Sequence, residues 1–104
     1  MNAEAWPRLR PRLTLGQRLQ GTVLPSPWPA GVTSIFVDLR LPVAGFVDVL
    51  LLPQDADRWP AVGAVTDFEI WWMDERPQIR LKPVDPAYLR DDYTEWATRF
   101  RGYA

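Results

Sequence analysis

The sequence contains no histidine and no cysteine. Their absence removes the commonest general base, the usual zinc ligands, disulfides and thiol chemistry. Only two serines are present, Ser26 and Ser34, and neither has a histidine partner for nucleophilic catalysis. A glycine-rich phosphate loop is also missing. We therefore expect no catalytic residues, no metal and no cofactor. Scattered carboxylates leave a carboxylate-dependent enzyme as a third alternative, after two kinds of binding module.

Long apolar segments are missing as well. No run is long enough to cross a bilayer, and no basic stretch followed by an apolar one resembles a signal peptide. We expect a cytoplasmic protein with no membrane partner. The 104 residues, 47% of them hydrophobic, are enough for one globular domain with its own core. The pattern does not indicate an oligomeric state.

The net charge of −1 hides an uneven distribution. Residues 1–20 carry four arginines against Glu4 alone, a local charge of +3, and the rest of the chain carries 8 bases and 12 acids, a local charge of −4. Pro7 and Pro11 are expected to break any helix in the basic segment. Residues 1–13 are therefore predicted to form a basic flexible tail. Such a tail either attracts a polyanion or only keeps the protein in solution.

Period-two alternation of apolar and polar residues begins after Gly16 and is typical of β-strands. It predicts five short strands within residues 14–84, which would close into a small barrel and leave no exposed edge. Residues 53–63 are predicted to be a loop or one short helical turn, with Trp59 plugging one end of the barrel. The alternation points Trp71 outward and Trp72 inward. The expected strands are 17–24, 34–41, 45–51, 64–73 and 78–82.

The period changes after Val84. Asp85 followed by Pro86 is a good helix start, with the acid at the cap and proline at the first helical position. Apolar residues then recur at steps of three and four, which predicts one amphipathic helix over residues 85–104, packed on the barrel. The stripe consists of Leu89, Tyr93, Trp96, Phe100 and Tyr103.

Four short motifs occur in order along residues 14–82. They are GQRLQGTV at 16–23, AGFVDVLLL at 44–52, VGAVTDFEIWWMD at 62–74, and QIRL at 78–81. Together they resemble the S-one RNA-binding domain, the OB-fold module repeated in the largest bacterial small-subunit ribosomal protein. The resemblance implies an OB-type barrel that binds single-stranded RNA on the outer face of its second and third strands.

The resemblance also implies site residues. Phe36 and Phe46 match aromatic positions of the family's stacking platform, and Asp74 matches the acid that follows its fourth strand. Asp48 stands where the family often has histidine, and the first aromatic of the second strand is missing, since Thr33 and Ser34 occupy that place. Trp71 is a third stacking candidate. The phosphate-contact candidates are Arg40, Arg80 and Lys82.

Two functions remain open at this point. Single-stranded RNA is the ligand that the resemblance implies. A protein–protein interaction module, acting as an adaptor or inhibitor, is favoured by the acidic body, the missing aromatic and Asp48, with Trp28 in its proline-rich loop as the partner contact. Asp38 and Asp48 are expected to be surface acids and not metal ligands. The choice depends on whether the Phe36 and Phe46 face is open or covered by the last helix.

Overall fold

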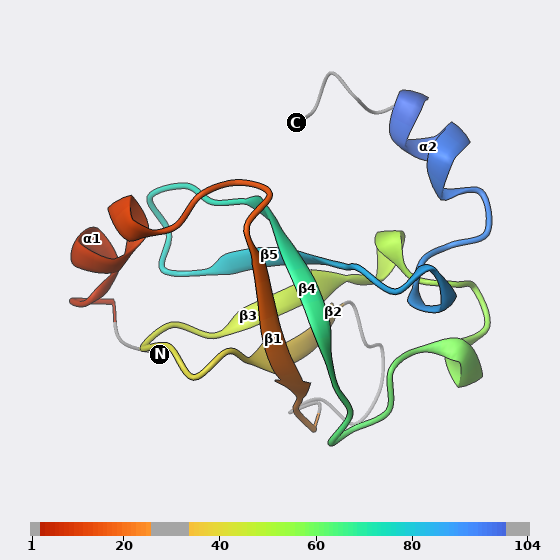
Figure 1. The fold of residues 1–104 in the computed structure, drawn as a ribbon, viewed down its shortest axis with the longest axis horizontal. Coiled ribbons are helices and arrows are strands. Elements are labelled where there is room, and N and C mark those ends of the chain that lie inside the picture. The colour runs from red at the N-terminus through yellow and green to blue at the C-terminus, as the bar shows by residue number, and fades with distance from the viewer. Residues whose placement is uncertain (1–2, 26–33, 100–104) are drawn as a thin grey trace.

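A computed structural model describes residues 3–25 and 34–99. Its five strands close into a barrel in the order β1–β2–β3–β5–β4 (Figure 1). Neighbouring strands pair antiparallel except β3 and β5, which run parallel. This arrangement confirms the predicted OB-type barrel with an added C-terminal helix. The strands are β1 (Arg18–Val23), β2 (Ser34–Asp38), β3 (Gly45–Asp48), β4 (Val65–Trp72) and β5 (Ile79–Pro83).

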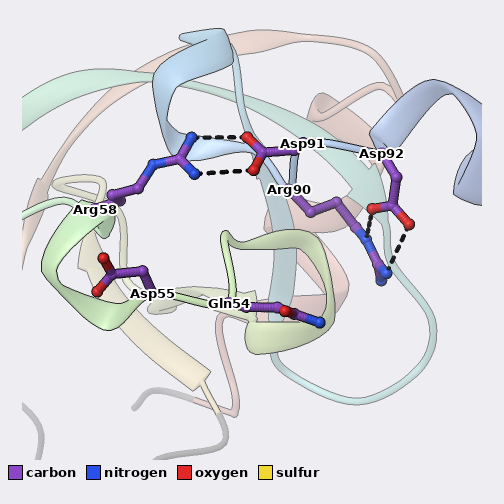
Figure 2. Close-up of a pocket in the computed structure, with 6 residues that line it drawn as sticks. All are labelled: Gln54, Asp55, Arg58, Arg90, Asp91 and Asp92. Atoms are coloured by element: carbon purple, nitrogen blue, oxygen red, sulfur yellow. Dashed lines mark hydrogen bonds and ion pairs between the residues drawn. The ribbon is translucent and has the colours of Figure 1, made fainter.

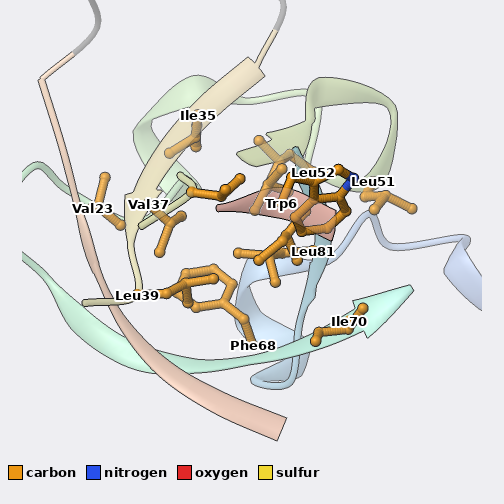
Figure 3. Close-up of a cluster of buried hydrophobic side chains, with 13 residues drawn as sticks. Trp6, Val23, Ile35, Val37, Leu39, Leu51, Leu52, Phe68, Ile70 and Leu81 are labelled. Atoms are coloured by element: carbon orange, nitrogen blue, oxygen red, sulfur yellow. The ribbon is translucent and has the colours of Figure 1, made fainter. Parts of the chain in front are cut away.

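The core fills the barrel with the apolar residues that alternate along each strand. Val37 of β2, Val47 of β3 and Phe68 of β4 have no exposed surface, and residues from every strand meet in one cluster (Figure 3). Their polar neighbours point outward because side chains alternate across a strand. Two glycines allow close approach to the core, since a Cβ at Gly21 would collide with Val37 and one at Gly45 with Leu81.

The N-terminal segment differs from the predicted tail. It forms a helical turn α1 (Trp6–Leu9) and a 3₁₀ turn η1 (Arg10–Arg12). Trp6 is 2% exposed and belongs to the core cluster, and its Nε1 donates a hydrogen bond to the Asp74 carbonyl oxygen at 2.9 Å. The prolines do not prevent these turns, because each stands in a first turn, where its missing N–H has no helical partner to lose.

The C-terminal segment is helical in two separate pieces. Asp85 caps the 3₁₀ turn η4 (Pro86–Tyr88) by accepting a hydrogen bond from the Ala87 amide. The chain then leaves the helical path, and the Arg90 amide donates to the Leu51 carbonyl before α2 (Tyr93–Arg99) begins. The predicted cap is therefore confirmed, but the predicted continuous helix is wrong between η4 and α2. Phe100 and Tyr103 of the predicted stripe lie outside the described residues.

Short 3₁₀ turns fill the connection between β3 and β4. Asp48 ends β3 and caps η2 (Val49–Leu51), so Val49 and Leu51 do not continue the strand as predicted. The turn η3 (Ala56–Arg58) lies where one short helical turn was predicted. Trp59 follows it, half-buried, and donates from Nε1 to the Pro53 carbonyl. Within residues 3–25 and 34–99, no helix has the length and apolar character needed to cross a membrane.

Candidate nucleic-acid interface

Two predicted aromatic residues lie directly opposite each other on the outside of the barrel. Phe36 of β2 pairs in register with Phe46 of β3, and Phe46 pairs with Arg80 of β5. Register partners share a face of the sheet. The flanking residues Val37 and Val47 are buried, so the face that carries the phenyl rings is the outer one. Phe36, Phe46 and Arg80 therefore form a row across three strands, which we call the aromatic row.

Arg80 packs closely within this row. Its guanidinium carbon lies 5.5 Å from the centre of the Phe46 ring, within the range of a cation–π interaction. Its Nε is buried and has no hydrogen-bond partner among the described residues. A guanidinium placed beside a ring on the outer face is suited to contact with a planar or anionic ligand group.

A β-bulge changes the expected direction of Trp72. Between β4 and β5, Ile70 pairs with Leu81 and Trp72 pairs with Arg80, so two steps on β4 match one step on β5. The extra residue reverses the alternation. Trp72 therefore shares the outer face with Arg80, half-buried, and the prediction that it points into the barrel is wrong. It extends the aromatic row onto β4, and sequence periodicity missed it because a bulge breaks the period.

Asp74 organises the chain just after β4. Its carboxylate accepts hydrogen bonds from the Arg76 amide, Nε and Nη2 atoms and, at 3.4 Å, from Trp72 Nε1. The Arg76 side chain and amide together hold the pKa of Asp74 well below its usual range. The predicted site acid therefore fixes the start of the β4–β5 loop and the edge of the Trp72 indole.

Trp71 and Lys82 lie apart from the aromatic row, beside α2. The Trp71 and Trp96 ring centres are 6.5 Å apart. Lys82 Nζ is 2.9 Å from a Glu69 carboxylate oxygen and 5.2 Å from the centre of the Tyr93 ring. Burial opposes the Lys82 charge, but its bond to Glu69 and its proximity to Tyr93 outweigh this effect and raise its pKa. These two predicted contacts already have partners within the protein.

The remaining predicted site residues lie at turns or outside the described residues. Arg40 is exposed in the β2–β3 loop, and its amide donates to Asp38 Oδ1 at 2.8 Å. Asp48 Oδ1 accepts from the Leu50 amide at 2.9 Å, so both acids hold turns. Among the described residues, no group of three or more acids could hold a metal ion. Trp28 lies outside the described residues.

The described part of α2 lies apart from the aromatic row. In Figure 1 it lies beyond the barrel, apart from β2 and β3. Its rings contact Trp71 and Lys82 of the barrel and the Arg90 guanidinium, which is 5.0 Å from the centre of the Trp96 ring. These residues of the last helix therefore cover a different face from the one that Phe36 and Phe46 occupy.

A polar hollow of about 440 Å³ lies between the η3 turn and the connection to α2 (Figure 2). Arg58 forms two hydrogen bonds with Asp91, at 2.8 and 3.0 Å, and Arg90 is ion-paired with Asp92. Arg90 Nη1 also donates to the Leu50 carbonyl. Four of the charged groups therefore pair with one another, and Asp55 is the lining acid with no ion pair among the described residues. The Arg58–Asp91 pair connects the C-terminal segment to the η3 turn.

Comparison with known proteins supports the fold and not a family. No family model matches the sequence, and no curated protein matches it significantly. The solution structure of GSP13 from Bacillus subtilis is similar, with a TM-score of 0.56 and 17% identity over 82% of this chain and 71% of that chain. A chain of the a/eIF2alpha–aDim2p–rRNA complex from Pyrococcus horikoshii OT3 has a TM-score of 0.54 and 13% identity.

That second match covers 86% of this chain but only 54% of the other, so the present chain spans about half of its length. A multidomain protein with nucleic acid binding domains from Streptococcus pneumoniae TIGR4 is a more distant match, with a TM-score of 0.45 and 16% identity. At these identities the likeness establishes the barrel fold alone. The more specific S-one resemblance stays a prediction.

Proposed function

We propose that this chain binds single-stranded RNA on the outer face of β2 and β3, with the contact continuing across β5. The observation that supports this most strongly is the in-register row of Phe36, Phe46 and Arg80. Sequence reasoning selected these three residues separately, and the strand pairing places them side by side. The structural likeness to a chain from a complex that contains rRNA supports the same class of ligand.

Stacking supplies the physical basis of the proposal. Bases of a single strand are free to lie against aromatic rings, and each stacked base contributes about 1–3 kcal/mol. Bases inside a duplex have their faces covered, so a duplex would not use this row. Arg80 would add a cation beside the ring on which a base stacks, and a nearby phosphate would give it an anionic partner.

The acid at position 48 has an explanation in the fold. Asp48 opposes RNA by its charge, which is why the sequence left a protein partner open. In the structure it caps η2, with Oδ1 on the Leu50 amide. This bond gives the acid a structural role in ending β3.

Titration of a fluorescently labelled pyrimidine RNA of about twelve nucleotides would test the proposal, with anisotropy as the readout. Wild-type protein should bind at low salt and bind more weakly as salt rises. Phe46→Ala should lower the affinity about 5- to 150-fold, as expected for the loss of one stacked base. Val65→Ala is the matched control, since Val65 is 58% exposed and pairs with Thr22, away from the row. Absence of binding at low salt would overturn the proposal.

A protein partner is the second candidate, and exposed apolar side chains favour it. Val62 is 63% exposed and Leu24 is 36% exposed, and both line a hollow of about 290 Å³ with Trp59. If this candidate is correct, affinity capture from the native source should return one stoichiometric protein, and Val62→Asp should lose it. Capture that returns no such protein, together with RNA binding by the wild type, would reject this second candidate.

A further inference from the structure

We infer that the N-terminal segment α1–η1 forms the phosphate-binding part of the RNA surface, through Arg8, Arg10 and Arg12. This inference rests on the proposed function. It assigns to α1 and η1 most of the electrostatic attraction for RNA, since the rest of the chain carries more acids than bases. Phosphate contacts position a nucleic acid on a protein, whereas stacking holds its bases.

The first line of evidence is the attachment of this segment. The buried Trp6 ring packs in the core, and its indole N–H is bonded to the Asp74 carbonyl. Asp74 also accepts from the indole of Trp72, the residue that extends the aromatic row. The arginines are therefore carried by turns that are fixed to the barrel beside the β4–β5 loop.

The second line of evidence is a hollow on the same side. Arg10 and Met73 line it together, with a volume of about 830 Å³, and Met73 directly follows Trp72. Its other lining residues come from residues 7–15, so the η1 turn and the end of β4 form its walls. The basic turn thus lies next to the end of β4.

The third line of evidence is the position of the aromatic row along the strands. Phe46 is the second residue of β3, and Arg80 is the second residue of β5. Both strands begin at the end of the barrel where the β4–β5 loop turns and where α1 lies (Figure 1). A single strand stacked on Phe46 that continues past Arg80 and Trp72 would therefore reach α1 and η1.

Charge supplies the fourth line of evidence. Arg8, Arg10 and Arg12 are exposed, and none of them takes part in an ion pair among residues 3–25 and 34–99. Among the other described bases, Arg58, Arg76, Lys82 and Arg90 have an acid partner, whereas Arg18, Arg40, Arg80 and Arg99 have none but are spread singly over the chain. Residues 1–20 carry a charge of +3 and the rest of the chain a charge of −4. A polyanion would therefore be attracted to this end of the barrel and repelled by most of the remaining surface.

The salt dependence of RNA binding tests this inference. The triple variant Arg8→Gln, Arg10→Gln, Arg12→Gln should bind the labelled RNA more weakly at low salt. The slope of the logarithm of affinity against the logarithm of salt concentration should become shallower by up to about 2, since each phosphate contact to a single strand contributes about 0.7. Exposed arginines add little to stability, so the thermal unfolding midpoint should stay close to that of the wild type.

The matched control removes arginines from the other end of the molecule. Arg58→Gln with Arg99→Gln breaks one exposed ion pair, which is worth little, and takes charge from the η3 turn and from the last described residue of α2. The salt slope of this double variant should change far less, for each charge removed, than the salt slope of the triple variant. Equal changes would mean that only net charge matters, and an unchanged slope in the triple variant would also overturn the inference.

Failure of the inference is distinguishable from failure of the proposed function. If the wild type binds RNA and Phe46→Ala weakens it, while the triple variant keeps the wild-type salt slope, the stacking surface stands and the basic segment has no part in it. If the wild type does not bind RNA at low salt, both proposals fall together.

Discussion

The guanidinium carbon of Arg80 lies 5.5 Å from the centre of the Phe46 ring, and the two residues are partners in the parallel pairing of β3 with β5. Their contact means that a ligand on one of them meets the other. It also means that neither side chain can be changed without altering the surroundings of its partner.

The first prediction is that these two residues act on RNA affinity as a coupled pair. Phe46→Leu and Arg80→Lys should each weaken binding, and the double variant should lose less than the sum, by about 0.5–1 kcal/mol. A double-mutant cycle measured by anisotropy checks this. Losses that add to within about 0.3 kcal/mol would show that the cation–ring contact does not contribute to binding.

The second prediction concerns Trp6 and the stability of the barrel. Trp6→Ala should lower the free energy of unfolding by about 3–5 kcal/mol, because it leaves a cavity in the core and an unpaired Asp74 carbonyl. Leu15→Ala, at a residue 56% exposed, should change it by less than about 0.5 kcal/mol. Urea unfolding followed by circular dichroism gives both values. A small effect of Trp6→Ala would mean that residues 1–13 are a tail after all.

The third prediction follows from the close approach at Gly21. A methyl group there would collide with Val37 Cγ1 and lie 3.1 Å from Leu39 Cδ2, so strands β1 and β2 would have to separate. Gly21→Ala should therefore destabilise the protein by about 1–3 kcal/mol, as overpacking does. Gln20→Ala, one residue earlier on β1 and exposed, is the control. Thermal unfolding of both variants would decide, and a Gly21→Ala midpoint equal to that of the control would contradict the packing.

The fourth prediction is a pH dependence centred on Asp74. Its pKa is lowered in the folded protein, chiefly by the hydrogen bonds from Arg76. A carboxylate with a depressed pKa stabilises the fold above its unfolded pKa of about 4, and this contribution is lost as the pH falls through the folded value. Asp74→Asn should thus be less stable than the wild type at about pH 7, and the difference should shrink below about pH 4.

Urea unfolding at about pH 7 and again below about pH 4 measures the difference in stability between Asp74→Asn and the wild type. Asp57→Asn provides the control, since Asp57 is exposed and its side chain forms no ion pair among the described residues. A gap between Asp74→Asn and the wild type that does not change with pH would assign the effect to the lost shape of the loop instead of to the charge.

Much of the barrel could be predicted from the sequence because strand periodicity is a local property. Val37, Val47 and Phe68 each alternate with polar neighbours, and burial on one side of a sheet requires that pattern. The Asp85 cap could also be predicted from the sequence, because an acid directly before proline often accepts a hydrogen bond from an amide in the first turn, here that of Ala87. These signals need only a few neighbouring residues.

The features that sequence reasoning missed depend on contacts between distant segments. Trp72 faces outward because the pairing with β5 contains a bulge, and periodicity within β4 does not reveal it. Trp6 is buried because its ring packs in a core built from distant strands, and the carbonyl of Asp74, 68 residues away, accepts its indole hydrogen bond. Pro7 and Pro11 suggested an irregular tail, although proline is well tolerated at the beginning of a helical turn.

The candidate site was recovered in part for the same reason. Phe36, Phe46 and Arg80 were placed on the outer face by alternation, and their meeting required only the strand order of the barrel. Trp71 and Lys82 were placed outward by the same rule, but their contacts with Trp96 and Tyr93 take them out of the row. Ligand binding by these residues stays a prediction.

The parallel junction of β3 and β5 has two register pairs, Gly45 with Ile79 and Phe46 with Arg80, so this seam of the cylinder is as short as the one between β1 and β2. A guest molecule held by Phe46 and Arg80 together would bridge that seam from outside. Occupancy would then slow the opening of the cylinder, and amide protons on both sides of the junction should exchange with solvent more slowly when the guest is present.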